Sequence, residues 1–108
     1  MQSSTIEFRS VGKSDQLQED YVNAYYIDDL KYRVSVARVS GKLYAFNGLC
    51  THQGFQLSAR RLTGTTLMCP CHGSQFDIVS GEVVRGPAKQ SLSMYQVRER
   101  NEVIEVQV

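Results

Sequence analysis

Two short motifs in the middle of the chain contain every cysteine and histidine of the sequence. They are Cys50-Thr-His52 and Cys69-Pro-Cys71-His72. Thiolates and neutral imidazoles are common protein ligands of zinc and iron. Each motif offers one thiolate and one imidazole within two or three positions, so a tight loop can direct two ligand atoms at one metal. The sequence therefore predicts a metal centre built from two loops.

Four ligands of two kinds fit two different metal centres. Two thiolates and two imidazoles can hold one Zn²⁺ tetrahedrally. They can also hold a two-iron cluster, with both cysteines on one iron and both histidines on the other. Zinc fingers usually pair Cys with Cys and His with His, each pair on one element. Here each loop mixes the two types, which favours the two-iron centre and leaves a structural zinc site as the alternative.

The remaining composition excludes several function classes. The 108 residues are enough for one domain. Lys and Arg total 12 and Asp and Glu total 11, so the net charge of +1 gives no reason to expect a nucleic-acid partner. The apolar runs are too short to span a membrane, and the first ten residues lack the pattern of a secretion signal. We therefore expect a cytoplasmic protein that makes no membrane contact.

The elements that must position the two loops are predicted to be strands. Alternation over residues 32–39 predicts a strand, Ser40-Gly41 a tight turn, and residues 42–46 the second strand of a hairpin. A second hairpin is expected from strands at 92–97 and 103–106, turned at 98–102.

Other segments give weaker signals. We expect a strand near residues 5–9, another at 25–27 followed by a turn at Asp28-Asp29, and one turn of helix at most within residues 12–20. Residues 47–87 hold six of the eight glycines. Because glycine permits positive φ and close backbone approach, this stretch is typical of a loop-built site on a β scaffold.

The motifs, with their neighbours, resemble the Rieske family. Cys50-Thr-His52-Gln-Gly54 and the stretch 69–77 are similar to its two cluster-binding loops, and 80–88 is similar to the segment that leads into its proline loop. The resemblance begins near Leu30 and reaches the C-terminus. It implies one all-β domain over residues 1–108, a Rieske-type β-sandwich of antiparallel sheets. A basal part (1–46 and 88–108) would carry a loop-built cluster-binding subdomain (47–87) at one end.

The resemblance implies one [2Fe–2S] cluster with a defined set of ligands. Cys50 and Cys69 would hold the inner iron, and His52 and His72 would hold the outer iron. The other ring nitrogens of the two histidines would face solvent, so they form the expected electron exit towards a partner. Their titration would couple proton loss to oxidation of the cluster.

Further residues would tune the cluster, again by resemblance. Ser74 would donate a hydroxyl hydrogen bond to a bridging sulfide and raise the reduction potential. Gly54 and Gly73 would let backbone N–H groups approach the sulfurs. Pro87, together with Gly86, would cover the cluster and limit access of water.

Two departures from high-potential Rieske proteins point to a lower potential. Those proteins carry a tyrosine where this chain has Phe76, and a disulfide between the loops. Cys71 stands at one end of that disulfide, but Phe55 occupies the other, so the bridge cannot form. We expect Cys71 to be a free thiol, and a potential in the intermediate-to-low part of the Rieske range of about −150 to +300 mV.

These expectations favour a soluble electron carrier. It would pass single electrons from a reductase to a terminal oxygenase of the aromatic-ring-hydroxylating type, docking at the His52 and His72 edge. The chain has no third histidine for a catalytic 2-His-1-carboxylate iron site, so we expect no oxygenase activity of its own. The alternatives are a Rieske small subunit of a nitrite-reductase-type or arsenite-oxidase-type enzyme, and a zinc-stabilised interaction module.

Overall fold

The computed structural model describes residues 8–27, 32–47, 60–69 and 73–107, and nearly all of its regular structure is antiparallel β. A seven-stranded sheet has the order β1-β10-β9-β4-β3-β2-β5. Its strands are β1 (Phe8–Lys13), β2 (Tyr21–Ile27), β3 (Tyr32–Val39), β4 (Lys42–Asn47), β5 (Arg60–Arg61), β9 (Met94–Arg100) and β10 (Val103–Gln107). β1 also contacts β2, so this sheet curls towards a barrel. The predicted all-β fold of antiparallel sheets is confirmed.

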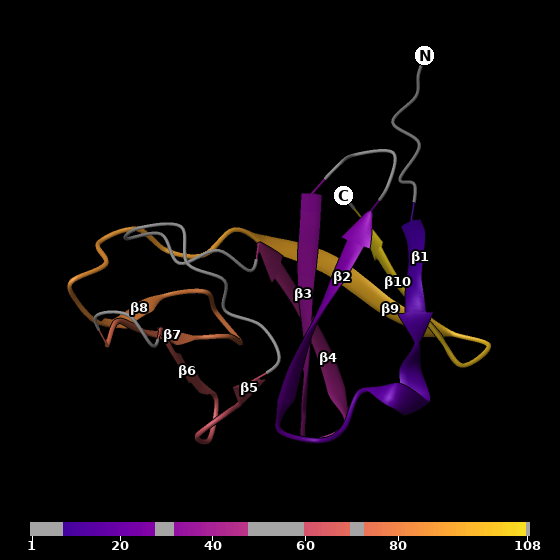
Figure 1. Ribbon diagram of the computed structural model, residues 1–108, viewed down its shortest axis with the longest axis horizontal. Coiled ribbons are helices and arrows are strands. Elements are labelled where there is room, and N and C mark those ends of the chain that lie inside the picture. Colours follow the sequence, from indigo (N-terminus) through magenta and orange to yellow (C-terminus); the bar gives the residue numbers. More distant parts are fainter. Residues whose placement is uncertain (1–7, 28–31, 48–59, 70–72, 108) are drawn as a thin grey trace, which may run out of the picture.

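A second, three-stranded sheet lies beside the first at one end of the long axis (Figure 1). Its order is β6-β7-β8, from β6 (Thr66–Met68), β7 (Gln75–Asp77) and β8 (Val83–Arg85). The sequence analysis predicted none of these strands, nor β5, although all four fall within residues 47–87. Strands of two or three residues are too short for alternation to show in a sequence.

The predicted hairpin around Ser40-Gly41 is confirmed. β3 and β4 pair from Val34↔Asn47 to Val39↔Lys42, and both turn residues have positive φ, 51° and 78°. Turns of this kind match the right-handed twist of the strands that they join.

The C-terminal hairpin is also present, but its turn is shorter than the predicted 98–102. β9 continues to Arg100, and only Asn101 and Glu102 form the turn, with φ of 52° and 64°. One face of this hairpin is exposed, so charged side chains can stand on its strands. Arg98 and Glu105 are cross-strand partners there, and Arg98 Nε lies 2.6 Å from Glu105 Oε1. β9 begins at Met94, two residues after the predicted start.

The N-terminal predictions are confirmed in part. The early strand is displaced, since β1 covers 8–13, and residues 5–7 lie outside the described residues. A single turn of 3₁₀ helix occupies Ser14–Gln16, in agreement with the short helical turn expected within 12–20. The predicted strand at 25–27 is the last part of β2, and the predicted turn at Asp28-Asp29 lies outside the described residues. None of the helices among the described residues has the length and hydropathy of a membrane span.

Two apolar clusters form the core, one on each face of β3. Val34 and Val36 point into a cluster shared with β10, whereas Ala37 points into a cluster shared with the three-stranded sheet. The second cluster, here called the inter-sheet core, consists of Val22, Ala37, Phe46, Leu62, Leu67, Cys69, Phe76, Ile78, Ala88 and Leu92. The inter-sheet core therefore fixes the smaller sheet against the larger one.

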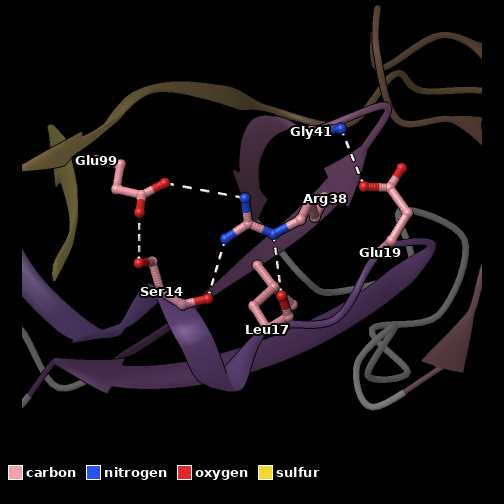
Figure 2. A network of polar contacts seen from close by, with 6 residues as sticks. All are labelled: Ser14, Leu17, Glu19, Arg38, Gly41 and Glu99. Carbon is pink, nitrogen blue, oxygen red and sulfur yellow. Dashed lines mark hydrogen bonds and ion pairs between the residues drawn. The ribbon is translucent and has the colours of Figure 1, made fainter. Parts of the chain in front are cut away.

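A polar network around Arg38 ties the N-terminal helical turn to the large sheet (Figure 2). Arg38 on β3 donates from Nε to Leu17 O and from Nη2 to Ser14 O, each at 3.0 Å. The Ser14 hydroxyl donates to Glu99 on β9 at 2.6 Å, and Glu99 also lies 3.9 Å from the Arg38 guanidinium. Charge-assisted bonds of this kind are stronger than neutral ones, so segments distant in sequence are held together.

A glycine in the β7–β8 turn is expected to resist substitution. Gly81 has a φ of +84°, and a Cβ there would lie 2.8 Å from Leu92 O. Gly41 has a similar φ of +78° but nothing within 4 Å of its Cβ position. Gly41→Ala should cost only the left-handed conformation, about 1–2 kcal/mol, whereas Gly81→Ala adds a backbone clash. We expect a clearly larger fall in thermal unfolding midpoint for Gly81→Ala. Equal falls would contradict the contact with Leu92 O.

Candidate metal centre

The structure describes four of the eight residues predicted to hold or surround the cluster. Cys69, Gly73, Ser74 and Pro87 are described, whereas Cys50, His52, Gly54 and His72 lie outside the described residues, as do Phe55 and Cys71. Within the described ranges, no three metal-ligating side chains gather at one place. The described part of the predicted centre is therefore the part around Cys69, Gly73, Ser74 and Pro87.

Cys69 stands at the start of a hairpin loop between β6 and β7. Met68 and Gln75 form the last pair of the ladder, and the Cys69 amide donates to Ser74 O at 2.7 Å. Inside the loop, the Gly73 amide donates to Cys69 O at 3.1 Å. These two bonds close the ends of the 69–74 loop on each other, so the backbone of Cys69 is fixed from both sides.

The Cys69 side chain is a free thiol inside the inter-sheet core. It is 2% exposed and is grouped there with Leu67, Phe76 and Ile78. An apolar shell around a metal ligand limits access of water and so affects the redox potential of a bound metal. The burial of Cys69 argues against a solvent-exposed reactive cysteine and leaves its sulfur available as an internal ligand.

Ser74 is a buried polar side chain five residues after Cys69. It is 0% exposed, and its Oγ accepts a hydrogen bond from the Ala88 amide at 3.0 Å. Its carbonyl accepts the bond from Cys69, so both its backbone and its side chain have partners. A fully buried hydroxyl is rarely retained in a core without a polar role, because its desolvation must be compensated.

The segment that follows β8 runs from Gly86 to Ser93 and is held at two points. Gly86 and Pro87 form a cis peptide bond and are exposed, whereas Ala88 is buried beneath them. Towards its end, Leu92 N–H donates to Gly81 O and Asn47 N–H donates to Ser93 O, each at 2.8 Å. The covering role of Pro87 stays a prediction, because its predicted neighbours at the cluster lie outside the described residues.

This half of the site fits an iron–sulfur cluster. Cys69 would supply a buried sulfur ligand, and Ser74, whose carbonyl is bonded to the Cys69 amide, carries a buried hydroxyl with a proton that a sulfur can accept. Hydrogen bonds to the sulfurs and burial are among the factors that set the potential of such clusters. When bound, the cluster supplies one-electron chemistry, while Cys69 would hold it and the inter-sheet core would exclude water.

The sequence analysis did not single out Ala88 as a partner of Ser74. Its backbone N–H bonds the Ser74 hydroxyl, and its residue type gives no sign of that bond. The only sequence signal near it is the similarity of the stretch 80–88 to the segment leading into the Rieske proline loop.

The sequence of the chain is similar to a known protein family and to several known proteins. The family model "Rieske [2Fe-2S] domain" matches residues 7–96. The ferredoxin component of a naphthalene 1,2-dioxygenase system from Pseudomonas putida is 32% identical over 68 residues, covering 63% of this chain and 65% of that protein. The matched segment thus spans slightly less than two thirds of that relative. A cytochrome b6-f complex iron-sulfur subunit from Synechococcus is 44% identical over 59 residues, covering 55% of this chain but only 32% of the subunit.

Among solved structures, the chain is similar to the ferredoxin of carbazole 1,9a-dioxygenase from Nocardioides aromaticivorans. The TM-score is 0.80 at 25% identity, and the match covers 93% of this chain and 96% of that one. The family match extends over far more than half of the sequence, and the fold agrees along nearly the whole chain. The protein therefore belongs to the Rieske [2Fe-2S] domain family.

Proposed function

We propose that this chain is an electron-transfer protein that carries one Rieske [2Fe–2S] cluster and passes single electrons from a reductase to a terminal oxygenase. The observation that carries the proposal is the similarity in size and fold to a free-standing dioxygenase ferredoxin, over 93% of one chain and 96% of the other. The dioxygenase ferredoxin component from Pseudomonas putida supports the same role. The chain would be a carrier and not itself an enzyme.

The proposed ligands follow from the two sequence motifs. Cys50 and Cys69 would bind one iron, and His52 and His72 would bind the other. The burial of Cys69 supports its place on the inner side of the cluster. We further propose that reductase and oxygenase dock at the edge formed by the two histidines, because an electron leaves most readily through ligands that reach the surface.

The division of the chain into two parts also stays a proposal. The three-stranded sheet supports a cluster-binding part within 47–87, and β1–β4, β9 and β10 support a basal part from 1–46 and 88–108. β5 falls within 47–87 but pairs with β2 of the larger sheet, so one short strand of the proposed cluster-binding part joins the basal sheet. We also propose that the terminal oxygenase is of the aromatic-ring-hydroxylating type and that the protein is cytoplasmic.

A second candidate is a Rieske subunit of a larger oxidoreductase, such as a nitrite-reductase-type or arsenite-oxidase-type enzyme. The identity of 44% to a cytochrome b6-f iron-sulfur subunit favours a subunit role. That match covers only 32% of the subunit, so it supports the cluster-bearing part more than the assembly. The match to a free-standing ferredoxin along almost its whole length makes the carrier the better-supported function.

A reconstitution experiment tests the proposal. Freshly prepared, oxygen-protected protein should contain iron and acid-labile sulfide in equal amounts and show a red-brown colour that bleaches on reduction. When a ring-hydroxylating oxygenase, its aromatic substrate and O₂ are then added, the reduced protein should reoxidise faster than with O₂ alone, and substrate should be consumed. Colourless protein with bound zinc would support the interaction module instead. Iron-loaded protein that stays reduced beside the oxygenase, but donates within a larger complex, would favour the subunit role.

A further inference from the structure

The Ala88 amide and the Ser74 hydroxyl form a buried contact between two separate segments. Ser74 directly precedes β7, and Ala88 follows β8 by three residues. The distance from Ala88 N to Ser74 Oγ is 3.0 Å; Ala88 is 3% exposed and Ser74 is 0% exposed. The contact therefore joins the loop that carries Cys69 to the segment that begins at Gly86.

This contact determines what the Ser74 hydroxyl can do. A hydroxyl has one proton to donate and two lone pairs that accept. The Ala88 N–H occupies one lone pair, so Ser74 is the acceptor at this contact and its own proton must point elsewhere. Among the described residues, no acceptor receives that proton. That proton is therefore free to bond an acceptor outside the described residues, such as a sulfur of the proposed cluster.

Both ends of the contact are held in place. The Ser74 carbonyl accepts from the Cys69 amide at 2.7 Å, which keeps the hydroxyl beside the thiol-bearing loop. Ala88 lies in the inter-sheet core with Phe76 and Leu92, and Leu92 N–H is bonded to Gly81 O at 2.8 Å. The Ala88 amide is therefore fixed in position, and its hydrogen bond restricts rotation of the Ser74 side chain.

We infer that Ala88 is a positioning residue whose amide orients the Ser74 hydroxyl, so that its proton is directed at a sulfur of the cluster held by Cys69. The inference rests on the proposed function. The step affected is the one-electron reduction of the cluster by its donor, and the hydroxyl proton is shared with sulfur but not transferred. An oriented donor stabilises the more negative, reduced cluster and so raises the reduction potential.

An amide-to-ester replacement tests this assignment on the full cluster-loaded chain. L-lactate in place of Ala88 keeps the methyl side chain and replaces the N–H by an oxygen. With Ser74 present, we expect the reduction equilibrium to shift about tenfold towards the oxidised cluster; for one electron this is a fall of about 59 mV in midpoint potential. In the Ser74→Ala background, the same ester should shift the equilibrium less than about twofold.

Two further variants keep the test decisive. Ala88→Gly retains the N–H and should leave the potential within about twofold of the parent equilibrium. Ala88→Pro also removes the N–H and places its ring carbon against the Ser74 Oγ, so it displaces the hydroxyl and should lower the potential at least as far as the ester does. Equal shifts in the Ser74 and Ser74→Ala backgrounds would overturn the inference, because the amide would then act without the hydroxyl.

The inference and the proposed function fail in different ways. A parent protein without iron and acid-labile sulfide would overturn the proposed function, and the inference with it. An iron-loaded parent whose midpoint potential does not respond to loss of the Ala88 N–H would overturn the inference alone. The midpoint potential is the deciding measurement, since a purely structural role of Ala88 would alter unfolding without a shift that depends on Ser74.

Discussion

Cys69→Ala is expected to remove the cluster completely. Cys69 is the described member of the proposed ligand set, and its thiol is buried where no other described residue can replace it. Without Cys69 the inner iron would lose one of its two cysteine ligands, so the ligand set of the cluster would be incomplete. Purified Cys69→Ala protein should contain no acid-labile sulfide and show none of the visible absorption of the parent.

The neighbouring residue provides a matched control. Met68 is the last residue of β6, directly before Cys69, and is 50% exposed. Met68→Ala therefore changes a neighbouring sulfur-bearing side chain that lies outside the inter-sheet core. This variant should keep the parent amounts of iron and sulfide. If Cys69→Ala also retained them, the cluster would have to be held by other residues and the proposed ligand set would be wrong.

The second large effect concerns Phe76, the central residue of the middle strand of the smaller sheet. It is fully buried and is paired with Leu67 on β6 and Val83 on β8. Truncation of a buried phenylalanine costs about 3–5 kcal/mol through lost burial and the cavity left behind. In a domain of this size, such a loss lowers the thermal unfolding midpoint by on the order of 10 °C or more.

Calorimetry of the cluster-loaded protein measures this effect. Val84→Ala is the control, because Val84 lies on the adjacent strand β8 but is 57% exposed. Exposed substitutions usually change stability by less than about 0.5 kcal/mol. A similar midpoint for the Phe76→Ala and Val84→Ala proteins would show that the smaller sheet contributes little to the stability of the whole.

Local signals account for the part of the fold that the sequence predicted. The β3–β4 hairpin was predictable because alternation and the Ser40-Gly41 dipeptide are both short-range features. The C-terminal turn was placed too broadly, at 98–102, because the local pattern of the charged segment Arg98 to Glu102 does not mark where the strands end. In the structure Arg98 lies on a strand, where its guanidinium stacks on Phe8 at 4.0 Å and pairs with Glu105. Such tertiary partners cannot be seen in a local pattern.

The smaller sheet escaped prediction for a different reason. Each of β6 and β7 has one buried residue at its centre, Leu67 and Phe76. One buried position per strand shows no period, and the surrounding glycines and polar residues suggest loops. This sheet is specified by its packing against the larger one, which is a property of the folded chain.

The prediction of the candidate site depends on residues whose side-chain type carries the chemistry. Cysteine and histidine at loop spacing indicated a metal centre, and resemblance to a known family indicated Ser74. The partner of Ser74 was not predictable, because Ala88 contributes a backbone N–H that every residue except proline has. Its position depends on the path of the chain after β8, which no residue type in that stretch reports.

The closed 69–74 loop has a consequence for how fast the proposed carrier can work. Each turnover changes the charge of the cluster by one, and nearby dipoles that were free to rotate would have to rearrange each time. The peptide groups of Cys69, Gly73 and Ser74 are already engaged in the bonds that close the loop. Fixed dipoles in a densely packed interior need little adjustment when charge arrives or leaves. The hairpin that presents the sulfur thus also suits rapid, repeated gain and loss of an electron.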